Sequence, residues 1–474
     1  MGRPEFAEPS SRVLALIRDI FSGDEGMFTA DLNDRLIYGR DCMPGGMLEL
    51  RRGLPPSLPD VVVFPRNVDD ISRLLRMAQQ EEIPVTTYGG GSGVCGAAVP
   101  VQAGITLDIK RLSRMAPVRK TSSTVHAEAG VNGERFERNL QRQGFTMGHF
   151  PSSIYCSTVG GWIAARSAGQ LSTKYGKIED MVVGLEGVLP TGEIFRTTTA
   201  PRSAAGPDLR QILIGSEGTL AVITAATLEV WPLPARKEYQ AYLFKDFLAG
   251  QRVIRELLQR GCRPSLLRLY DEADTALQVQ HLKLNVGKGA LMLLAVEGES
   301  ELVDADLAEI ESLAGGVAVD LGPGPVEHWF GRRYGVNYNL SRILPNPKMV
   351  LDTMEVAALW KDIPKLYAAV KGTVGARAML LCHLSHAYAE GACLYFSFMG
   401  NSGSEDDLLV YRTLWDDLLA SVGASGGTIS HHHGVGSLKQ DALIRQNGPF
   451  QEIFRGIKQA VDPAGILNPG KLGL

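Results

Sequence analysis

The stretch Val85–Val99, VTTYGGGSGVCGAAV, is the most informative part of this 474-residue chain. An apolar run leads directly into its glycines, which are Gly89, Gly90, Gly91, Gly93 and Gly96. Glycines at this density accept positive φ angles and let backbone N–H groups converge on an anion without interference from Cβ atoms. A plain glycine-rich turn does not need so many. We therefore expect this loop to hold a phosphate or pyrophosphate group.

The G-x-G-x-x-G pattern of Gly91, Gly93 and Gly96 is typical of Rossmann dinucleotide loops only when a helix follows the last glycine. Here Pro100 and the alternating apolar residues of 104–109 predict a strand. The acidic residue expected about 20 positions further on also has no convincing candidate. The pattern therefore argues against a Rossmann fold.

The composition is that of an ordinary soluble enzyme, with 45% hydrophobic and 21% charged residues. A chain of 474 residues is too long for one hydrophobic core, so two or three lobes are expected. A net charge of −4 without basic clusters argues against a nucleic-acid partner. The six cysteines include no C-x-x-C pair, which suggests neither a zinc cluster nor a disulfide framework. Because the chain also lacks a signal sequence and an apolar run of about 18 residues, we expect a cytoplasmic protein.

Changes of pattern along the chain predict four segments. Residues 1–56 indicate a helical arm, and residues 57–234 combine buried strands, helices and three loops of small residues. Residues 235–425 alternate strands with longer helices, which is typical of a separate α+β lobe. Residues 426–474 carry the sequences HHHGVG and NPGK.

Two further loops of small residues follow the glycine loop. The first, at 151–176, contains several hydroxyl residues and the pair Gly160–Gly161, and the second, GSEGTL at 215–220, ends an apolar run. Small side chains let a flat aromatic ligand lie close against the backbone. A tightly packed helix–strand junction is the alternative explanation of the first loop.

The three loops, their order and the tail resemble the flavoprotein oxidases of the vanillyl-alcohol oxidase class, which have a PCMH-type FAD-binding domain. The matching stretches run from about residue 57 to the C-terminus and are VVVFPRNVDDISRLLRMA, TYGGGSG, PSSIYCSTVGGWIAARSAG, KYGKIEDMVVG, GSEGTLAVIT and ILNPGK. The resemblance implies an α+β fold in which a PCMH-type domain of two subdomains, 57–234, holds FAD. A second α+β domain, 235–425, caps the substrate, and the segment 426–474 returns to the flavin.

In this class the glycine loop binds the FAD pyrophosphate. Because the loop in this chain contains no histidine, the resemblance implies a non-covalent flavin. The residues that it assigns to FAD are Tyr88, Gly89, Gly90, Gly91, Ser92, Gly93, Ser152, Ser153, Ser157, Thr158, Gly160, Gly161, Ala165, Ser167, Ala168, Glu217, Gly218, Thr219, Val222, Ile223 and Asn468.

Within the class, the chain is most similar to the alkylglycerone-phosphate synthase family, through STVGGW, GPDLRQILIGSEGTL, RPSLLRLYDEAD, GACLYFSF and TISHHHGVG. This likeness implies that Tyr395 is the general acid/base and that three histidines line the substrate side of the flavin. Those histidines are His431, His432 and His433. The likeness also implies that Arg268 and Arg342 bind an anionic substrate.

These residue types suit such chemistry. Arginine binds carboxylate or phosphate through paired hydrogen bonds, and a histidine cluster or a buried tyrosine can exchange protons with a substrate. Simpler alternatives are a core aromatic at Tyr395 and a packing or metal-binding role for the histidines. We assign no metal ligands, and whether His383, His386 and His432 bind a metal stays open.

The resemblance implies exchange of the acyl group of an acyl-dihydroxyacetone phosphate for a fatty alcohol through a flavin N5 adduct. That reaction takes a small, anionic and lipid-like substrate, and it implies peripheral membrane contact and a homodimer. The main alternative is an FAD-linked D-2-hydroxyacid dehydrogenase for D-lactate or glycolate that passes electrons to another acceptor. Such enzymes usually carry a His-x-Gly-Asp-Gly-Asn-x-His motif, which HAYAEGACLY replaces here. A flavin subunit that only relays electrons is a third alternative.

Overall fold

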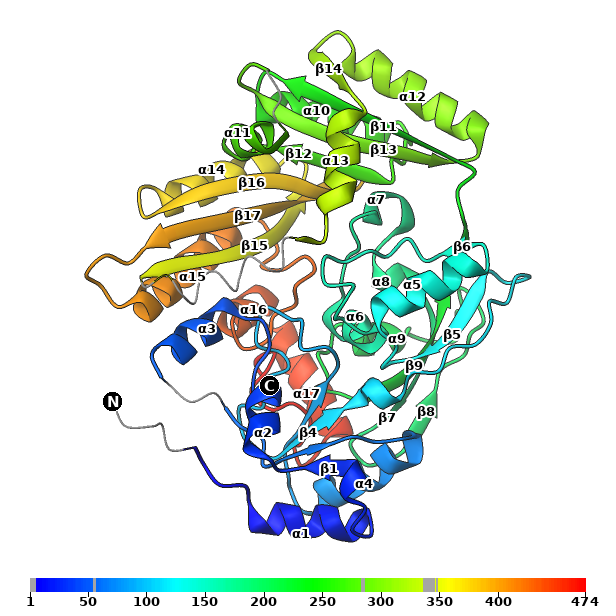
Figure 1. The fold of residues 1–474 in the computed structure, drawn as a ribbon, viewed down its shortest axis with the longest axis vertical. Helices are drawn as coiled ribbons and strands as arrows, with labels where there is room; N and C mark the ends of the chain where they lie inside the picture. The colour runs from blue at the N-terminus through cyan, green and yellow to red at the C-terminus, as the bar shows by residue number, and fades with distance from the viewer. Residues whose placement is uncertain (1–5, 54–56, 283–285, 336–345, 347) are drawn as a thin grey trace.

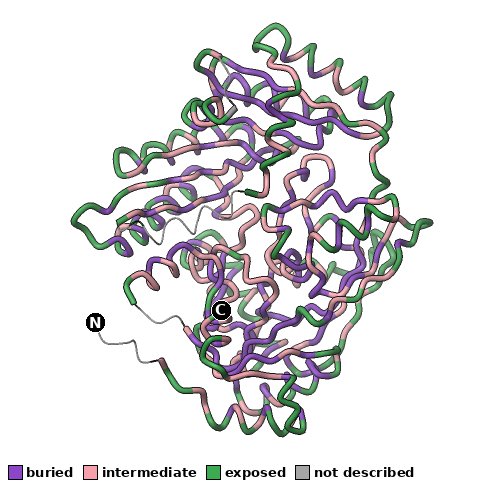
Figure 2. The backbone as a smooth tube through the Cα atoms, viewed as in Figure 1, coloured by how far each residue is buried: buried purple, intermediate pink, exposed green. Residues whose placement is uncertain are grey.

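The computed structural model describes the chain except residues 1–5, 54–56, 283–285, 336–345 and 347. The described strands form four sheets, and helices pack around them (Figure 1). Figure 2 shows that the buried residues follow the strands, whereas the outer turns are exposed. In this part of the chain, no helix combines the length and the apolar character needed to cross a membrane.

The first sheet places the glycine loop. Its strand order is β1-β2-β4-β3, with β2 and β3 parallel to β4 and β1 antiparallel to β2. These strands are β1 (Phe28–Thr29), β2 (Val61–Val63), β3 (Val85–Tyr88) and β4 (Ile105–Asp108). Both β2 and β4 are buried along their whole length, as expected of strands in a covered parallel arrangement. The glycine loop begins directly after β3.

Helix α4 (Val68–Gln80) connects β2 to β3. Asn67 caps it by accepting a hydrogen bond from the Asp70 N–H, and the first-turn carboxylates of Asp69 and Asp70 complement the helix dipole. Its apolar residues recur on one face and are buried; they are Ile71, Leu74, Leu75 and Ala78. This face fixes the helix against the sheet.

The N-terminal segment contributes helices to this half of the molecule. They are α1 (Ser11–Ile20), α2 (Leu32–Tyr38) and α3 (Pro44–Arg51). The segment is not wholly helical, because Phe28 and Thr29 pair with Val63 and Val62. Two residues of the segment predicted to be a helical arm thus form a short strand along the apolar edge of β2.

The second four-stranded sheet is antiparallel and has the order β5-β9-β7-β8. Its strands are β5 (Thr124–Glu128), β7 (Val182–Val188), β8 (Ile194–Arg196) and β9 (Val222–Glu229), and a short pair beside it is β6 (Phe145–Thr146) with β10 (Trp231–Pro232). The helices here are α5 (Gly133–Arg142), α6 (Val159–Ala165), α7 (Ser172–Tyr175), α8 (Ile178–Met181) and α9 (Arg210–Leu213). Apolar side chains of both four-stranded sheets share one core, which fixes the loops of the two halves relative to each other.

The seven-stranded sheet lies at the top of Figure 1 and has the order β14-β11-β13-β12-β16-β17-β15. Its strands are β11 (Arg236–Phe244), β12 (Leu266–Tyr270), β13 (Ala290–Gly298), β14 (Ala318–Gly322), β15 (Met349–Leu359), β16 (Ala378–Ala387) and β17 (Gly391–Asn401). Its helices are α10 (Phe247–Gln259), α11 (Glu272–Leu282), α12 (Ser300–Ala314), α13 (Gly324–Arg332), α14 (Ile363–Val374) and α15 (Asp407–Ala424). A second core, separate from the first, holds most of this layer together.

The C-terminal segment connects the two halves. It contains α16 (Gln440–Asn447) and α17 (Phe450–Val461). After α17 the Val85 N–H donates to the Ile466 carbonyl, and the Asn468 N–H donates to the Val85 carbonyl. Before α16, Thr428 pairs with Ala357 of β15. The segment therefore joins β15 of the seven-stranded sheet to β3, the strand before the glycine loop, and its histidines lie between these two attachments.

Candidate active site

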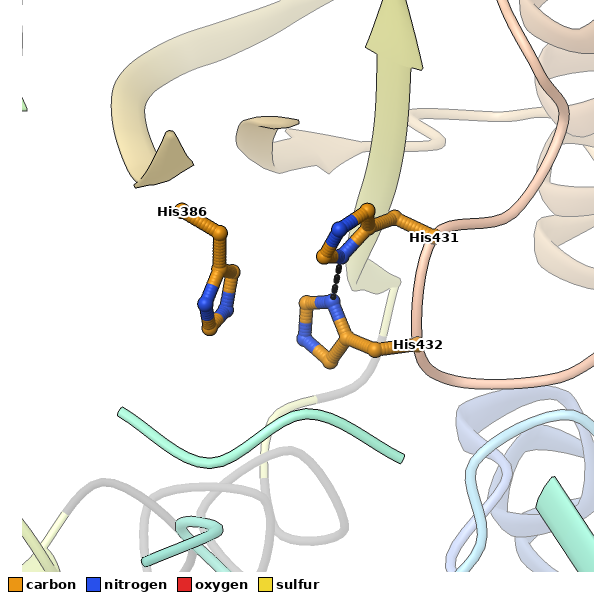
Figure 3. Close-up of side chains that lie close together, drawn as sticks. All are labelled: His386, His431 and His432. Atoms are coloured by element: carbon orange, nitrogen blue, oxygen red, sulfur yellow. Dashed lines mark hydrogen bonds between the residues drawn. The ribbon is translucent and has the colours of Figure 1, made fainter. Parts of the chain in front are cut away.

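Three histidines from two distant parts of the chain face one another (Figure 3). His386 lies near the end of β16, and His431 and His432 belong to the loop before α16. The Nδ1 atoms of His431 and His432 are 3.0 Å apart, so one of them carries a proton and donates a hydrogen bond to the other. His386 Nδ1 lies 2.6 Å from the Ser172 hydroxyl, and His431 Nε2 lies 3.0 Å from the Tyr388 hydroxyl.

Burial keeps these imidazoles neutral. It lowers the pKa of His431 to about 3, with the nearby Lys177 acting in the same direction. Burial and the neighbouring histidines hold the pKa values of His386 and His432 well below the usual value. Neutral imidazoles can accept a proton or bind a metal. The donor atoms of the three rings lie within 4.8 Å of one another, so they could hold a metal ion.

A fully buried carboxylate, Glu355 on β15, anchors the histidine loop. Its Oε1 accepts hydrogen bonds from the backbone N–H groups of His431, His432 and His433, at 3.2, 3.3 and 2.8 Å. Its Oε2 accepts one from the buried Lys439 ammonium at 2.8 Å and lies 3.2 Å from His433 Nδ1. Burial alone raises a carboxyl pKa, but His433 and Lys439 hold the pKa of Glu355 well below its usual value. A charged Glu355 therefore fixes the backbone of all three histidines.

Tyr395 and His383 lie opposite each other on β17 and β16, and their rings stack with centroids 5.0 Å apart. His383 Nε2 is 3.0 Å from the Arg268 guanidinium and Nδ1 is 3.2 Å from Asp274 Oδ2. Because arginine only donates, Nε2 must accept and Nδ1 must carry the proton. Burial raises the pKa of Tyr395 to about 12, so its phenol stays protonated. Its ring lies 6.1 Å from that of His432, which joins both groups into one site.

Of the two arginines predicted to bind substrate, the structure describes only Arg268. Arg268 lies over the ring of Trp329 at 5.1 Å, and among the described residues it forms no ion pair with a carboxylate. It is therefore available to an anionic ligand beside Tyr395. Arg342 lies outside the described residues.

The glycine loop packs against the second small-residue loop. A Cβ on Gly90 would lie 1.8 Å from the Cys156 carbonyl oxygen, and one on Gly89 would lie 2.5 Å from Thr158 Oγ1. Thr158 also caps α6 by accepting a hydrogen bond from the Gly161 N–H. The backbones of the two loops can approach this closely only because these positions carry no side chain.

Other residues predicted to contact FAD pair with the C-terminal segment or with neighbouring side chains. Glu217 accepts hydrogen bonds from the N–H groups of Val435 and Gly436, and Asn468 donates to the Glu217 carbonyl. Several others make internal contacts: Ser152 with Gln170, Ser157 with Trp162, Ser167 with His149 and Thr219 with Ser216. Val222 and Ile223 start β9 within the first core, Ala168 is buried, and Ala165 ends α6.

Sequence reasoning missed Glu355, Lys439 and Asp274. All three are buried charged residues, but only Glu355, in MEVAAL, lies between apolar neighbours in the sequence, and this pattern is the one available signal. Charged side chains are rarely buried unless paired. The signal marks Glu355 as unusual, but it does not identify the histidine loop as its partner.

Comparisons with known proteins fit this geometry. Residues 59–198 match the family model of an FAD binding domain. Residues 233–472, half of the chain, match that of the FAD linked oxidases, C-terminal domain. The chain belongs to the FAD-linked oxidase family. It is therefore an FAD-dependent enzyme, as the sequence predicts.

Individual relatives of this FAD-linked oxidase differ in activity. An alkyldihydroxyacetonephosphate synthase of Trypanosoma brucei brucei is 30% identical, over 96% of this chain and 79% of the relative. The glycolate oxidase subunit GlcD of Bacillus subtilis (strain 168) is 28% identical, over 92% of each chain. A solved alkyldihydroxyacetonephosphate synthase has a TM-score of 0.83 at 25% identity and covers 98% of this chain and 86% of its own.

The solved p-cresol methylhydroxylase has a TM-score of 0.81 at 18% identity and covers 98% of both chains. This likeness shows the fold alone. Together with the FAD-binding match, it confirms the α+β, PCMH-type fold class predicted from sequence.

The residues present fit FAD. Near the junction of glycine loop and tail, three buried polar atoms have no partner among the described residues: Thr87 Oγ1, Asn468 Oδ1 and Lys471 Nζ. Burial lowers the pKa of Lys471 to about 8, although Asp41 and Glu217 oppose this shift. Unpaired buried polar atoms are costly unless a ligand completes them. The pyrophosphate and hydroxyl groups of FAD offer acceptors and donors for this set.

We expect Gly90→Ala to weaken FAD binding by about 1–3 kcal/mol or more, because the added methyl group overpacks against Cys156. Flavin fluorescence titration of apoprotein measures this affinity. Gly372→Ala in α14 is the matched control, since a Cβ there meets no atom within 4 Å. Unchanged FAD affinity in Gly90→Ala contradicts a tight junction at the cofactor.

The buried histidines also predict acid sensitivity. Burial lowers the pKa of His149 to about 3 from 6.5, and His431 shifts in the same way. Between these values the unfolded chain binds more protons than the folded chain, so the free energy of unfolding falls as pH falls. Each such histidine changes it by up to about 1.4 kcal/mol per pH unit.

Urea denaturation between about pH 7 and about pH 5 measures this slope. We expect the free energy of unfolding to fall by several kcal/mol over the range. His149→Gln should reduce the slope while keeping a polar group near Ser167. A flat profile in the wild-type protein contradicts buried, neutral histidines.

Proposed function

We propose that this FAD-linked enzyme replaces the acyl group of an acyl-dihydroxyacetone phosphate with a fatty alcohol. One observation carries the proposal. The hydrogen-bonded pair His431 and His432 lies beside the protonated Tyr395. Next to them is Arg268, which has no carboxylate partner among the described residues. This set can bind an anion and move protons in both directions at one place. The synthase named above, 30% identical, supports the substrate class.

Each residue has a distinct role in this proposal. Arg268 binds the phosphate or the polarised carbonyl of the substrate. The neutral His432, held by His431, accepts the proton from the carbon next to the carbonyl and returns it to that carbon when the product forms. Tyr395 stays protonated and donates a hydrogen bond to the ester oxygen that leaves and to the alcohol oxygen that enters. FAD, when bound, would supply an electron acceptor for the substrate carbon.

The exchange leaves the redox state unchanged. The bond between the ketose carbon and the ester oxygen breaks, and a bond between that carbon and the alcohol oxygen forms. The fatty acid leaves as a carboxylate, and the alcohol proton is released. Peripheral membrane contact and a homodimer, which suit a lipid-like substrate, stay predictions.

The test is incubation of the FAD-loaded enzyme with palmitoyl-dihydroxyacetone phosphate and hexadecanol under nitrogen. We expect the alkyl product and free palmitate in equal amounts, with no net change of flavin absorbance after turnover. Absence of both products removes the proposal. If neither the ester nor a hydroxy acid perturbs the flavin spectrum, the chain is an electron-relay subunit instead.

A second candidate is oxidation of a D-2-hydroxy acid such as D-lactate or glycolate, with electrons passed to another acceptor. The grouping of His386, His431 and His432 favours it, because a metal ion held there could polarise a hydroxyl or carboxylate. The glycolate oxidase subunit named above supports it as well. Anaerobic bleaching of the flavin by glycolate, abolished by EDTA, is the result that establishes this activity over exchange.

A further inference from the structure

Arg333, directly after α13, is a second cation beside the site. Its guanidinium carbon lies 4.8 Å from the ring centroid of Phe150, 4.9 Å from that of Phe330 and 4.7 Å from that of Tyr334. Aromatic faces attract a cation, and arginine stacks well on them. Three such contacts hold one guanidinium in a defined place.

The hydrogen-bonding capacity of this guanidinium is not used up. One of its terminal nitrogens, Nη1, is buried without an acceptor, and among the described residues Arg333 forms no ion pair with a carboxylate. Burial also lowers the pKa of Arg333, which records the cost of removing the cation from water. Cation–π contacts offset part of this cost, but they leave the buried N–H unpaired.

One hydrogen bond and the position of Arg333 after α13 place it at the border of the active site. Its carbonyl accepts a hydrogen bond from Gln170 Nε2, and Gln170 lies two residues before Ser172, which contacts His386. On its other side, Trp329 lies one helical turn earlier, about 6 Å along the axis, and packs under Arg268. Arg333 thus lies between the loop that touches the histidines and the helix that touches the first substrate-binding arginine.

Gln170, which reaches the backbone of Arg333, carries an unpaired acceptor. Its Oε1 is buried and has no donor among the described residues, whereas its Nε2 reaches Ser152 and the Arg333 carbonyl. A ligand with an oxyanion for Arg333 and a hydroxyl for Gln170 satisfies both unpaired atoms. The glycine loop contacts Cys156 and Thr158 instead, so the FAD pyrophosphate has its own cradle.

We propose that Arg333 binds the anionic group, phosphate or carboxylate, of a small hydroxylated or carbonyl-bearing substrate. The inference rests on the proposed function only in placing the reacting carbon at the histidine cluster. It gives the enzyme two arginines for one substrate. Such a pair suits a dianionic phosphate ester better than an uncharged alcohol.

The test is titration of the FAD-loaded enzyme, followed by the flavin absorbance difference spectrum. The probes are dihydroxyacetone phosphate, glycolate and uncharged dihydroxyacetone. We expect saturable binding of an anionic probe to wild type, weakened about 10- to 150-fold in Arg333→Gln and less in Arg333→Lys. Arg332→Gln is the matched control, because Arg332 is exposed and contacts only His328 among the described residues. It should bind within about twofold of wild type.

The outcomes separate the inference from the proposed function. Equal affinity of Arg333→Gln and wild type for both anions overturns the inference, and so does weakened FAD binding with unchanged anion binding. Arg333→Lys keeps the charge and provides the measurement if Arg333→Gln does not fold. If glycolate but not dihydroxyacetone phosphate binds in an Arg333-dependent way, the inference is supported and the phosphate-ester substrate is ruled out. Exchange activity together with anion binding that does not depend on Arg333 supports the proposed function and overturns the inference.

Discussion

Glu355→Ala is expected to lower the free energy of unfolding by about 3–5 kcal/mol, the range for removing one partner of a buried ion pair. The substitution leaves the fully buried Lys439 without its carboxylate. It also removes the acceptor of three backbone N–H groups in the histidine loop. Both losses occur where water cannot replace the missing group.

Urea denaturation of the FAD-loaded protein measures the effect, and a double-mutant cycle tests its cause. Glu355→Ala combined with Lys439→Met should recover part of the loss, because no unpaired buried charge remains. Glu238→Ala is the control, because its ion pair with Arg236 is partly exposed and surface ion pairs contribute little to stability. A change below about 1 kcal/mol in Glu355→Ala contradicts the anchoring role.

Tyr395→Phe is expected to lower kcat by about 10²- to 10³-fold with little change in KM, which is the usual contribution of a hydrogen-bond donor to a reacting oxygen. Burial raises the pKa of Tyr395 to about 12, so the wild-type phenol is a hydrogen donor throughout the assay range. Phenylalanine keeps the stacking on His383 but has no proton to donate. The kcat of wild type should therefore show no ionisation of Tyr395 between about pH 6 and pH 9.

Steady-state kinetics with whichever substrate proves active provide the measurement. Tyr242→Phe is the matched control, because its hydroxyl contacts Glu311 far from the histidines. It should keep kcat within about twofold and retain its FAD. A Tyr395→Phe enzyme with wild-type kcat shows that this hydroxyl donates no hydrogen bond to the reacting oxygens.

Much of the loop structure on the proposed cofactor side could be predicted from sequence, because its determinants are local. Gly89 and Gly90 follow β3 directly, and their lack of a Cβ is a property of those positions alone. The Asn67 cap and the one-sided apolar pattern of α4 are local in the same way. Such features depend on a few consecutive residues, so composition and spacing reveal them.

The proposed catalytic side depends on strand register, which the sequence does not display. Glu355 pairs with Tyr395 across β15 and β17, and Tyr395 pairs with His383 across β17 and β16. A one-residue slip turns each side chain to the opposite face. His383 and His386, three residues apart, would face opposite sides of a regular strand. The register shift between Leu384 and His386 allows both to reach the site.

The sequence by itself determined the cofactor class and the loops expected to hold it, because glycine geometry and small side chains act on the backbone nearby. Only the tertiary structure decided the charge states and partners of the site. Burial sets the low pKa of His431 and the high pKa of Tyr395, and Glu355 reaches the histidine loop from 76 residues away. Desolvation and long-range contacts exist only once distant segments have packed together.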